Sequence, residues 1–93
     1  MGEKIAKEEF MVPKEHLHMR PCSDVAKIVN SAGVTAIMHC NGKTANMSSV
    51  LDLLSIGVPA GTPVLIQVLN GVDSQTEQVL QQIKSVLERT TMA

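Results

Sequence analysis

The chain has 93 residues, of which 44% are hydrophobic and 18% charged, and its formal net charge is −1. This length predicts one domain, because roughly 100–200 residues per domain is usual, and the apolar fraction predicts a folded chain. The near balance of charge argues against nucleic-acid binding driven by phosphate neutralisation. The only aromatic residue, Phe10, cannot supply the stacking surface of a single-strand binder.

Targeting and membrane segments are not indicated. The charged N-terminus lacks the apolar core of a signal peptide, and the charge-free stretch over residues 53–72 is interrupted by several glycines and prolines. Two cysteines, Cys22 and Cys40, are too few for a disulfide framework. We therefore expect a single cytoplasmic domain over residues 1–93, without membrane insertion and without a metal or cofactor.

The first predicted elements are a short strand and a helix. Residues 1–7 are charged and are expected to be mobile, whereas the apolar residues 10–12 predict a strand. After a polar loop, apolar side chains at helical spacing predict a helix over about residues 19–31. Pro21 suits its first turn, where a missing N–H costs no hydrogen bond, and Gly33 suits the left-handed position after its end.

A β-hairpin and a short second helix follow. Residues 34–40 alternate with the period of a strand, and the following Asn-Gly pair predicts a tight turn into a returning strand over residues 43–47. The pair Ser48-Ser49 can cap a short helix that stops at Gly57. This helix begins with four large apolar side chains among five residues, so either some of them form a surface contact patch or all belong to the core.

The last elements are a strand and a long amphipathic helix. Residues 64–69 alternate as a strand, and Asn70-Gly71 predicts a turn. The sequence from Ser74 to Glu77 reads as a capping box at the start of a helix over about residues 74–89. The order strand, helix, strand, strand, helix, strand, helix predicts an α+β fold with one sheet and the helices on one face.

The segment His18-Met19-Arg20-Pro21 carries the clearest chemical signal. It places an imidazole at the start of a helix, where free backbone N–H groups and the positive end of the helix dipole favour a bound phosphate. The dipole disfavours imidazolium and so keeps a ring nitrogen lone pair available, and Arg20 can stabilise phosphoryl oxygens. The spacing alone also fits a solvated loop histidine or a simple helix cap.

These residues resemble the HPr family, the phosphocarrier proteins of the bacterial sugar phosphotransferase system. The resemblance runs from about residue 9 to residue 88. It rests on the following segments: His18-Met19-Arg20-Pro21, Asn41-Gly42-Lys43-Thr44, Ser49-Val50-Leu51, Ser55-Ile56-Gly57-Val58, and Gly61 before the last strand. It implies an open-faced β-sandwich in which three helices cover one face of a four-stranded antiparallel sheet.

The resemblance also implies a function, site residues and partners. His18 would accept a phosphoryl group from phospho-enzyme I through Nδ1, with Arg20 beside it, and would pass the group to a sugar-specific enzyme IIA. Such a carrier is not a stand-alone enzyme. Ser49 matches the serine that HPr kinase/phosphorylase modifies in many members, which would bring in a catabolite-control regulator as a further partner. The residues that match the family's docking face are Met19, Ser23, Lys27, Val50, Leu51 and Leu54.

Several positions depart from the family pattern. His16 stands where the family has glycine, so that a left-handed backbone there would be strained. Met19 is bulkier than usual and could shield the phosphoryl site, and Cys22 replaces an alanine and is expected to be a small core residue. Asp24 and Asp52 add negative charge to the docking face, and Ser48 stands where lysine is frequent. These departures suggest a specialised or mainly regulatory copy.

Two alternatives to a phosphocarrier stay open. The first is a regulatory binding module of the same fold that acts through Ser49 phosphorylation or the apolar patch. The second is a metal site that uses His16 and His18, or the adjacent His39 and Cys40. Their spacing matches no established zinc pattern, and neighbouring residues of one strand point to opposite faces.

Overall fold

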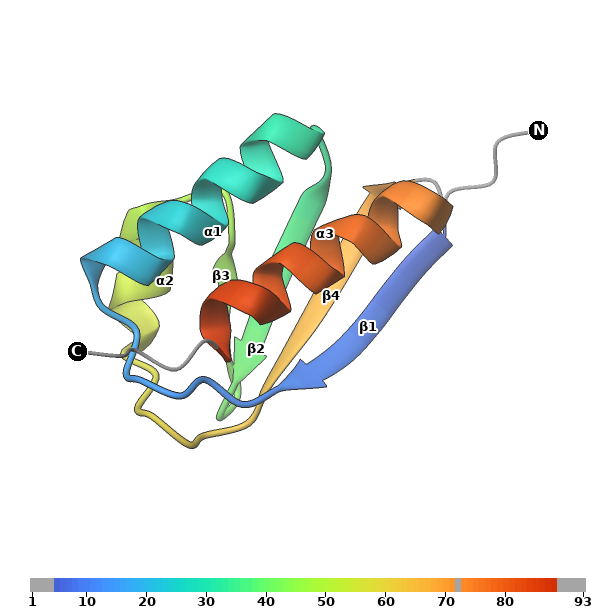
Figure 1. The fold of residues 1–93 in the computed structure, drawn as a ribbon. Coiled ribbons are helices and arrows are strands. Elements are labelled where there is room, and N and C mark those ends of the chain that lie inside the picture. Colours follow the sequence, from blue (N-terminus) through green and yellow to red (C-terminus); the bar gives the residue numbers. More distant parts are fainter. Residues whose placement is uncertain (1–4, 72, 89–93) are drawn as a thin grey trace.

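The computed structural model describes residues 5–71 and 73–88 (Figure 1). Their elements are β1 (Ile5–Met11), α1 (Met19–Ala32), β2 (Thr35–Cys40), β3 (Lys43–Asn46), α2 (Val50–Ile56), β4 (Val64–Gly71) and α3 (Asp73–Leu87). The strands form one antiparallel sheet in the order β1-β4-β2-β3, and the helices lie on one face of it. This α+β open-faced sandwich is the predicted fold.

The hydrophobic core lies between the sheet and the helices. Alternate side chains of β2 are buried, as the strand period requires, and α1 buries one face against them. The largest fully buried side chains are Met11, Met38, Met47, Leu53, Ile66, Ile83, Val25, Val29, Val58, Val64, Val68 and Thr76. Methionine is prominent here because its flexible side chain fills irregular gaps in a small core.

The first strand is longer than the sequence predicts. It begins at Ile5 rather than at residue 10, and Lys7 pairs with Val68 of β4. Residues 5–7, which the sequence assigned to a mobile end, belong to this strand, while residues 1–4 lie outside the described part of the chain. The reason is tertiary: polar residues that carry no strand signal of their own gain backbone hydrogen bonds from a neighbouring strand.

The hairpin turn is confirmed, but two local signals near the end of β4 are misread in the sequence. Asn41 and Gly42 both have positive φ, as a tight hairpin turn requires. Asn70-Gly71, predicted as a turn, instead ends β4, where the left-handed Asn70 (φ 62°) coincides with a register irregularity against β1. Helix α3 begins at Asp73, so Ser74 lies within its first turn and is not the predicted cap.

None of the described helices is long and apolar enough to span a lipid bilayer.

The first two helices end at glycines. Both α1 and α2 are followed by a glycine in the left-handed conformation, Gly33 (φ 69°) and Gly57 (φ 66°). These sharp ends fix where the chain turns back toward the sheet.

Candidate functional site

The loop between β1 and α1 is tied to the rest of the molecule on both sides of its centre. Lys14 donates its backbone N–H to the Leu87 carbonyl at 2.9 Å, and the Pro13 carbonyl accepts from Gly61 at 2.8 Å. On the other side Leu17, whose side chain is buried, donates to the Val58 carbonyl at 2.9 Å. This anchoring fixes the entry of the chain into α1, and with it the position of residue 18.

His18 is the residue immediately before α1. Its backbone is extended (φ −115°, ψ −170°), its carbonyl accepts the first helical bond from Cys22 at 3.2 Å, and its side chain makes no capping hydrogen bond. The ring is 41% exposed, so it is neither sequestered nor used as a cap. Since Pro21 has no N–H, the first turn offers the N–H groups of Met19 and Arg20 to a bound anion.

Two side chains of the loop surround the His18 ring. Its Nε2 lies 3.5 Å from Oε1 of Glu15, and its ring centroid lies 5.2 Å from that of His16, with the two planes tilted by 52°. Glu15 is not among the candidate site residues that the sequence indicates. The one signal in the sequence that could have indicated it is an acidic residue three positions before the candidate acceptor, in a loop that must bend. The two ring nitrogens of His18 therefore face different surroundings.

The expected strain at His16 is absent. Among the described residues only Asn41 and Asn70 combine a side chain with a positive φ, so His16 has an ordinary backbone conformation. The left-handed backbone that would strain a residue with a Cβ at this position is therefore not adopted, and the imidazole lies exposed beside the His18 ring. The histidine at this position therefore introduces no left-handed backbone strain.

Arg20 lies in the first turn of α1 with an exposed side chain. No ion pair or hydrogen bond holds its guanidinium within the described part of the chain. Lys27 lies seven residues further on, which is two turns of the same helical face. Met19, which follows His18 in the chain, has a side chain that is 57% exposed.

Ser49 is the cap of α2, and its Oγ accepts from the Asp52 backbone N–H at 3.3 Å. The carbonyl of the preceding residue accepts from Asn30 Nδ2 at 3.2 Å, and the same Nδ2 donates to the Ala26 carbonyl at 2.8 Å. The start of α2 therefore lies beside the second half of α1, whereas His18 precedes the first turn of that helix.

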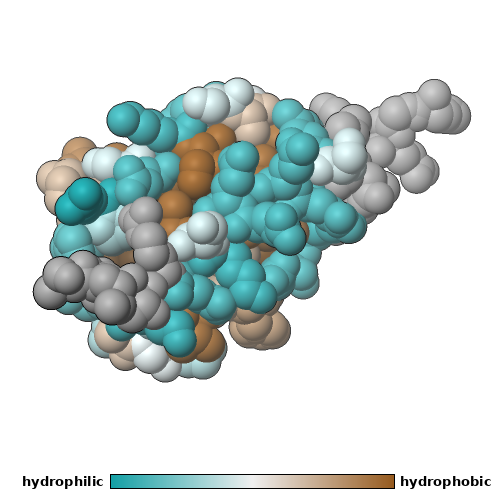
Figure 2. Space-filling view, in the orientation of Figure 1, coloured by the Kyte–Doolittle hydropathy of each residue, from teal (hydrophilic) through white to brown (hydrophobic). Residues whose placement is uncertain are grey.

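The crowded second helix divides its apolar residues between core and surface. Leu53 is buried, Val50 and Leu54 are half-buried against the core, and Leu51 is 76% exposed. This outcome confirms the prediction that some of these side chains reach the surface. Figure 2 shows the helical side of the molecule as mainly hydrophilic, with isolated hydrophobic areas. Of the two acidic departures on the expected docking face, Asp52 is exposed and Asp24 is half-buried.

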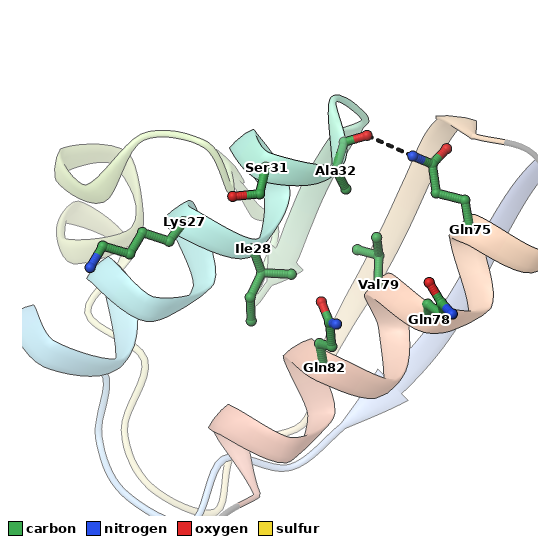
Figure 3. Close-up of a pocket in the computed structure, with 8 residues that line it drawn as sticks. All are labelled: Lys27, Ile28, Ser31, Ala32, Gln75, Gln78, Val79 and Gln82. Atoms are coloured by element: carbon green, nitrogen blue, oxygen red, sulfur yellow. Dashed lines mark hydrogen bonds between the residues drawn. The ribbon is translucent and has the colours of Figure 1, made fainter.

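A groove of about 470 Å³ lies between α1 and α3 (Figure 3). Ile28 and Val79 line its apolar part, Gln75 closes one end by donating to the Ala32 carbonyl at 2.7 Å, and Lys27 extends away from the other lining residues. Neither His18 nor Arg20 lines this groove. The groove is therefore separate from the candidate phosphoryl site.

The remaining histidine and the cysteines lie elsewhere. His39 Nε2 is 3.2 Å from Oε1 of Gln67 on the neighbouring strand, while Cys40 points into the core, so the two residues use opposite faces of β2 as predicted. Both cysteines are free. Cys22 is 1% exposed, which confirms it as a core residue, and this burial raises the pKa of its thiol and makes it a poor nucleophile.

Comparisons with known proteins agree with this fold. The family model described as the PTS HPr component phosphorylation site matches residues 7–89. The phosphocarrier protein HPr of Mycoplasma capricolum is 29% identical over 83 residues, which are 89% of this chain and 90% of that protein.

Solved structures give the same architecture. A histidine-containing phosphocarrier protein of Mycoplasma has a TM-score of 0.74 at 23% identity, over 90% of this chain and 100% of that one. HPr from Bacillus anthracis has a TM-score of 0.72 at 22% identity, over 91% and 98% of the two chains. The fold is thus that of the small histidine phosphocarriers. By its match to the family model over most of its length, the chain belongs to the HPr family of the phosphotransferase system.

Proposed function

We propose that this protein is a cytoplasmic phosphocarrier that accepts a phosphoryl group on His18 from phospho-enzyme I and passes it to an enzyme IIA. The single observation that carries the proposal is the exposed imidazole of His18. An anchored loop holds it at the start of α1, and neither of its ring nitrogens makes a capping hydrogen bond to the helix. The family match supplies the partner proteins.

The chemistry requires positioning and charge stabilisation more than covalent machinery. The lone pair of one ring nitrogen attacks phosphorus, the bond between phosphorus and the donor breaks, and its electron pair stays with the donor. The negative phosphoryl oxygens would meet the N–H groups of the first turn of α1 and the exposed guanidinium of Arg20. In the second transfer the same nitrogen recovers its electron pair.

The test is phosphorylation by purified enzyme I and phosphoenolpyruvate, followed by intact mass. The native protein should gain the mass of one phosphoryl group, and His18→Ala should gain none. Arg20→Ala should slow the transfer by about 10²–10³-fold, as loss of one donor to a developing oxyanion does.

The matched control is His16→Ala, which removes the neighbouring imidazole and leaves His18 in place. It should keep the mass gain, because the proposal assigns no phosphoryl transfer to His16. A mass gain that survives His18→Ala, or native protein that gains no mass, would refute the proposal.

A second candidate function is a regulatory module controlled at Ser49. It is favoured by the position of Ser49 at the cap of α2, two residues before the exposed Leu51 and outside the first turn of α1. A phosphate there would meet the favourable end of α2 and the unfavourable carboxylate of Asp52. Modification at Ser49 would thus change partner docking without occupying the phosphoryl-transfer site.

HPr kinase/phosphorylase with ATP tests this second function. Ser49→Ala should abolish an acid-stable mass gain, whereas Ser55→Ala, which removes another exposed hydroxyl of α2, should retain it. The phosphorylated protein should then bind a catabolite-control regulator more tightly than the unmodified protein does. No acid-stable phosphate on the native protein would rule the regulatory function out. Loss of the Ser49 cap should also cost about 1 kcal/mol of folding stability.

A further inference from the structure

We propose that Glu15 is a positioning residue that keeps the proton of the neutral His18 ring on Nε2 and thereby presents Nδ1 as the nucleophile. The inference deepens the proposed function and rests on it for its catalytic consequence. It concerns a residue outside the His-x-Arg-Pro segment, and it stands on the geometry of the loop.

The surroundings of the two ring nitrogens support this assignment. Oε1 of Glu15 lies 3.5 Å from Nε2, and both side chains are 41% exposed. The separation is longer than a good hydrogen bond, so the carboxylate acts mainly through its negative charge, which favours a proton on the nearer nitrogen. Nδ1 makes no capping bond to α1 and has no hydrogen-bond partner among residues 5–71 and 73–88.

The loop holds this arrangement from both sides. Lys14 and Leu17 donate backbone hydrogen bonds to Leu87 and Val58, which hold the backbone in place on both sides of Glu15. The His16 ring lies beside His18, with its centroid 5.2 Å away and its plane tilted by 52°. The charged or titratable groups next to the His18 ring in sequence are Glu15, His16 and Arg20, and of these only Glu15 brings negative charge.

The proton position matters in both directions of transfer. When Nδ1 attacks phosphorus, the proton on Nε2 stays where it is, and the ring becomes a phosphorylated imidazolium beside the carboxylate of Glu15. When the phosphoryl group leaves, the electron pair of the N–P bond returns to Nδ1 and the proton again remains on Nε2. Neither step then needs a proton from outside, which would not hold if the ring carried its proton on Nδ1.

The experiment is ¹⁵N NMR of the His18 ring in the unmodified, ¹⁵N-labelled protein at about pH 8.5, where unperturbed histidine is neutral. The native ring should show a protonated Nε2 and an unprotonated Nδ1. Glu15→Ala should lower the ratio of the two tautomers by about twofold to fivefold, the range expected for one exposed charge contact. Glu15→Gln, which keeps an oxygen but loses the charge, should fall between the two.

Glu77→Ala is the matched control, because it removes an exposed carboxylate that pairs with Lys7 on β1. It should leave the His18 nitrogen shifts unchanged. An unchanged tautomer ratio in Glu15→Ala, or a shift of the proton toward Nε2, would overturn the role of Glu15.

The readout uses no phosphoryl donor, so failure of the phosphocarrier function and failure of this inference are separate results. If His18 is phosphorylated, Glu15→Ala should also slow transfer in proportion to the fall in the population of the tautomer with its proton on Nε2. If Glu15→Ala shows the expected fall in the tautomer ratio but an unchanged transfer rate, only the catalytic consequence is overturned.

Discussion

At the scale of single residues, the candidate acceptor and the guanidinium near it could be picked out from the sequence, while their immediate neighbours could not. His18 and Arg20 belong to one short segment whose chemistry is local. The contact of Glu15 with Nε2 depends on how the loop bends between its anchors on Leu87 and Val58, which are distant in the sequence. A bend of this kind has no periodic signature, so only the folded chain reveals it.

Thr76 provides a test at the same scale. It is fully buried, and its Oγ1 has no hydrogen-bond partner within the described part of the chain. An unsatisfied buried hydroxyl costs about 1–3 kcal/mol, so Thr76→Val, which keeps the shape, should raise the free energy of unfolding by about 1 kcal/mol. Chemical denaturation of the variant and of the native protein measures this change in the free energy of unfolding.

The control for this change is Thr76→Ser, which keeps the hydroxyl and removes a methyl group from the core. It should destabilise the protein because of the cavity it leaves. If Thr76→Val were less stable than the native protein, the hydroxyl would have to be satisfied in solution.

At the scale of elements, the glycines that follow α1 and α2 determine where these helices stop. Gly33 ends α1 with φ 69°, and its N–H bonds back to the carbonyls of Val29 and Asn30. A Cβ built on Gly33 would meet no heavy atom within 4 Å. The only obstacle to a side chain there is therefore the left-handed backbone itself.

Gly33→Ala should therefore lower the free energy of unfolding by about 1 kcal/mol, the cost of a left-handed conformation for a residue with a Cβ. Gly33→Asn should lose less, because asparagine tolerates this conformation, as Asn41 and Asn70 do in this chain. Equilibrium denaturation of the two variants separates the effects. Equal stability of Gly33→Ala and the native protein would mean that the end of α1 is not fixed by this conformation.

At the scale of the whole molecule, the sheet separates two surfaces. The helices lie on one side of the sheet (Figure 1), where His18 precedes α1 and α2 carries the exposed Leu51. Phe10 is 70% exposed although its neighbour Met11 is fully buried in the core, so Phe10 lies on the opposite face of β1. Two exposed apolar side chains of similar accessibility thus belong to different faces, and only one of them can meet a partner that docks over His18.

Leu51→Asp should lower kcat/KM for phosphoryl transfer from phospho-enzyme I by about tenfold, because loss of one important apolar contact costs more than 1 kcal/mol of binding energy. Its stability should stay within about 0.5 kcal/mol of the native value, since the side chain is exposed. Phe10→Asp should leave transfer unchanged. Equal effects of the two substitutions on transfer would show that docking does not depend on the helical side.

The sequence by itself determined the order of the elements, the buried faces of the strands and helices, and the candidate acceptor at the start of α1. These features depend on residues that are close neighbours, through side-chain period, caps and turn residues. The pattern also indicated that some apolar residues of α2 reach the surface, which Leu51 confirms.

The tertiary structure alone decided the full length of β1, the irregular end of β4, and the placement of the start of α2 beside α1. It also decided which nitrogen of the His18 ring faces a carboxylate. Each of these depends on hydrogen bonds and packing between segments far apart in the chain, and the free energy of such contacts is absent from any local pattern.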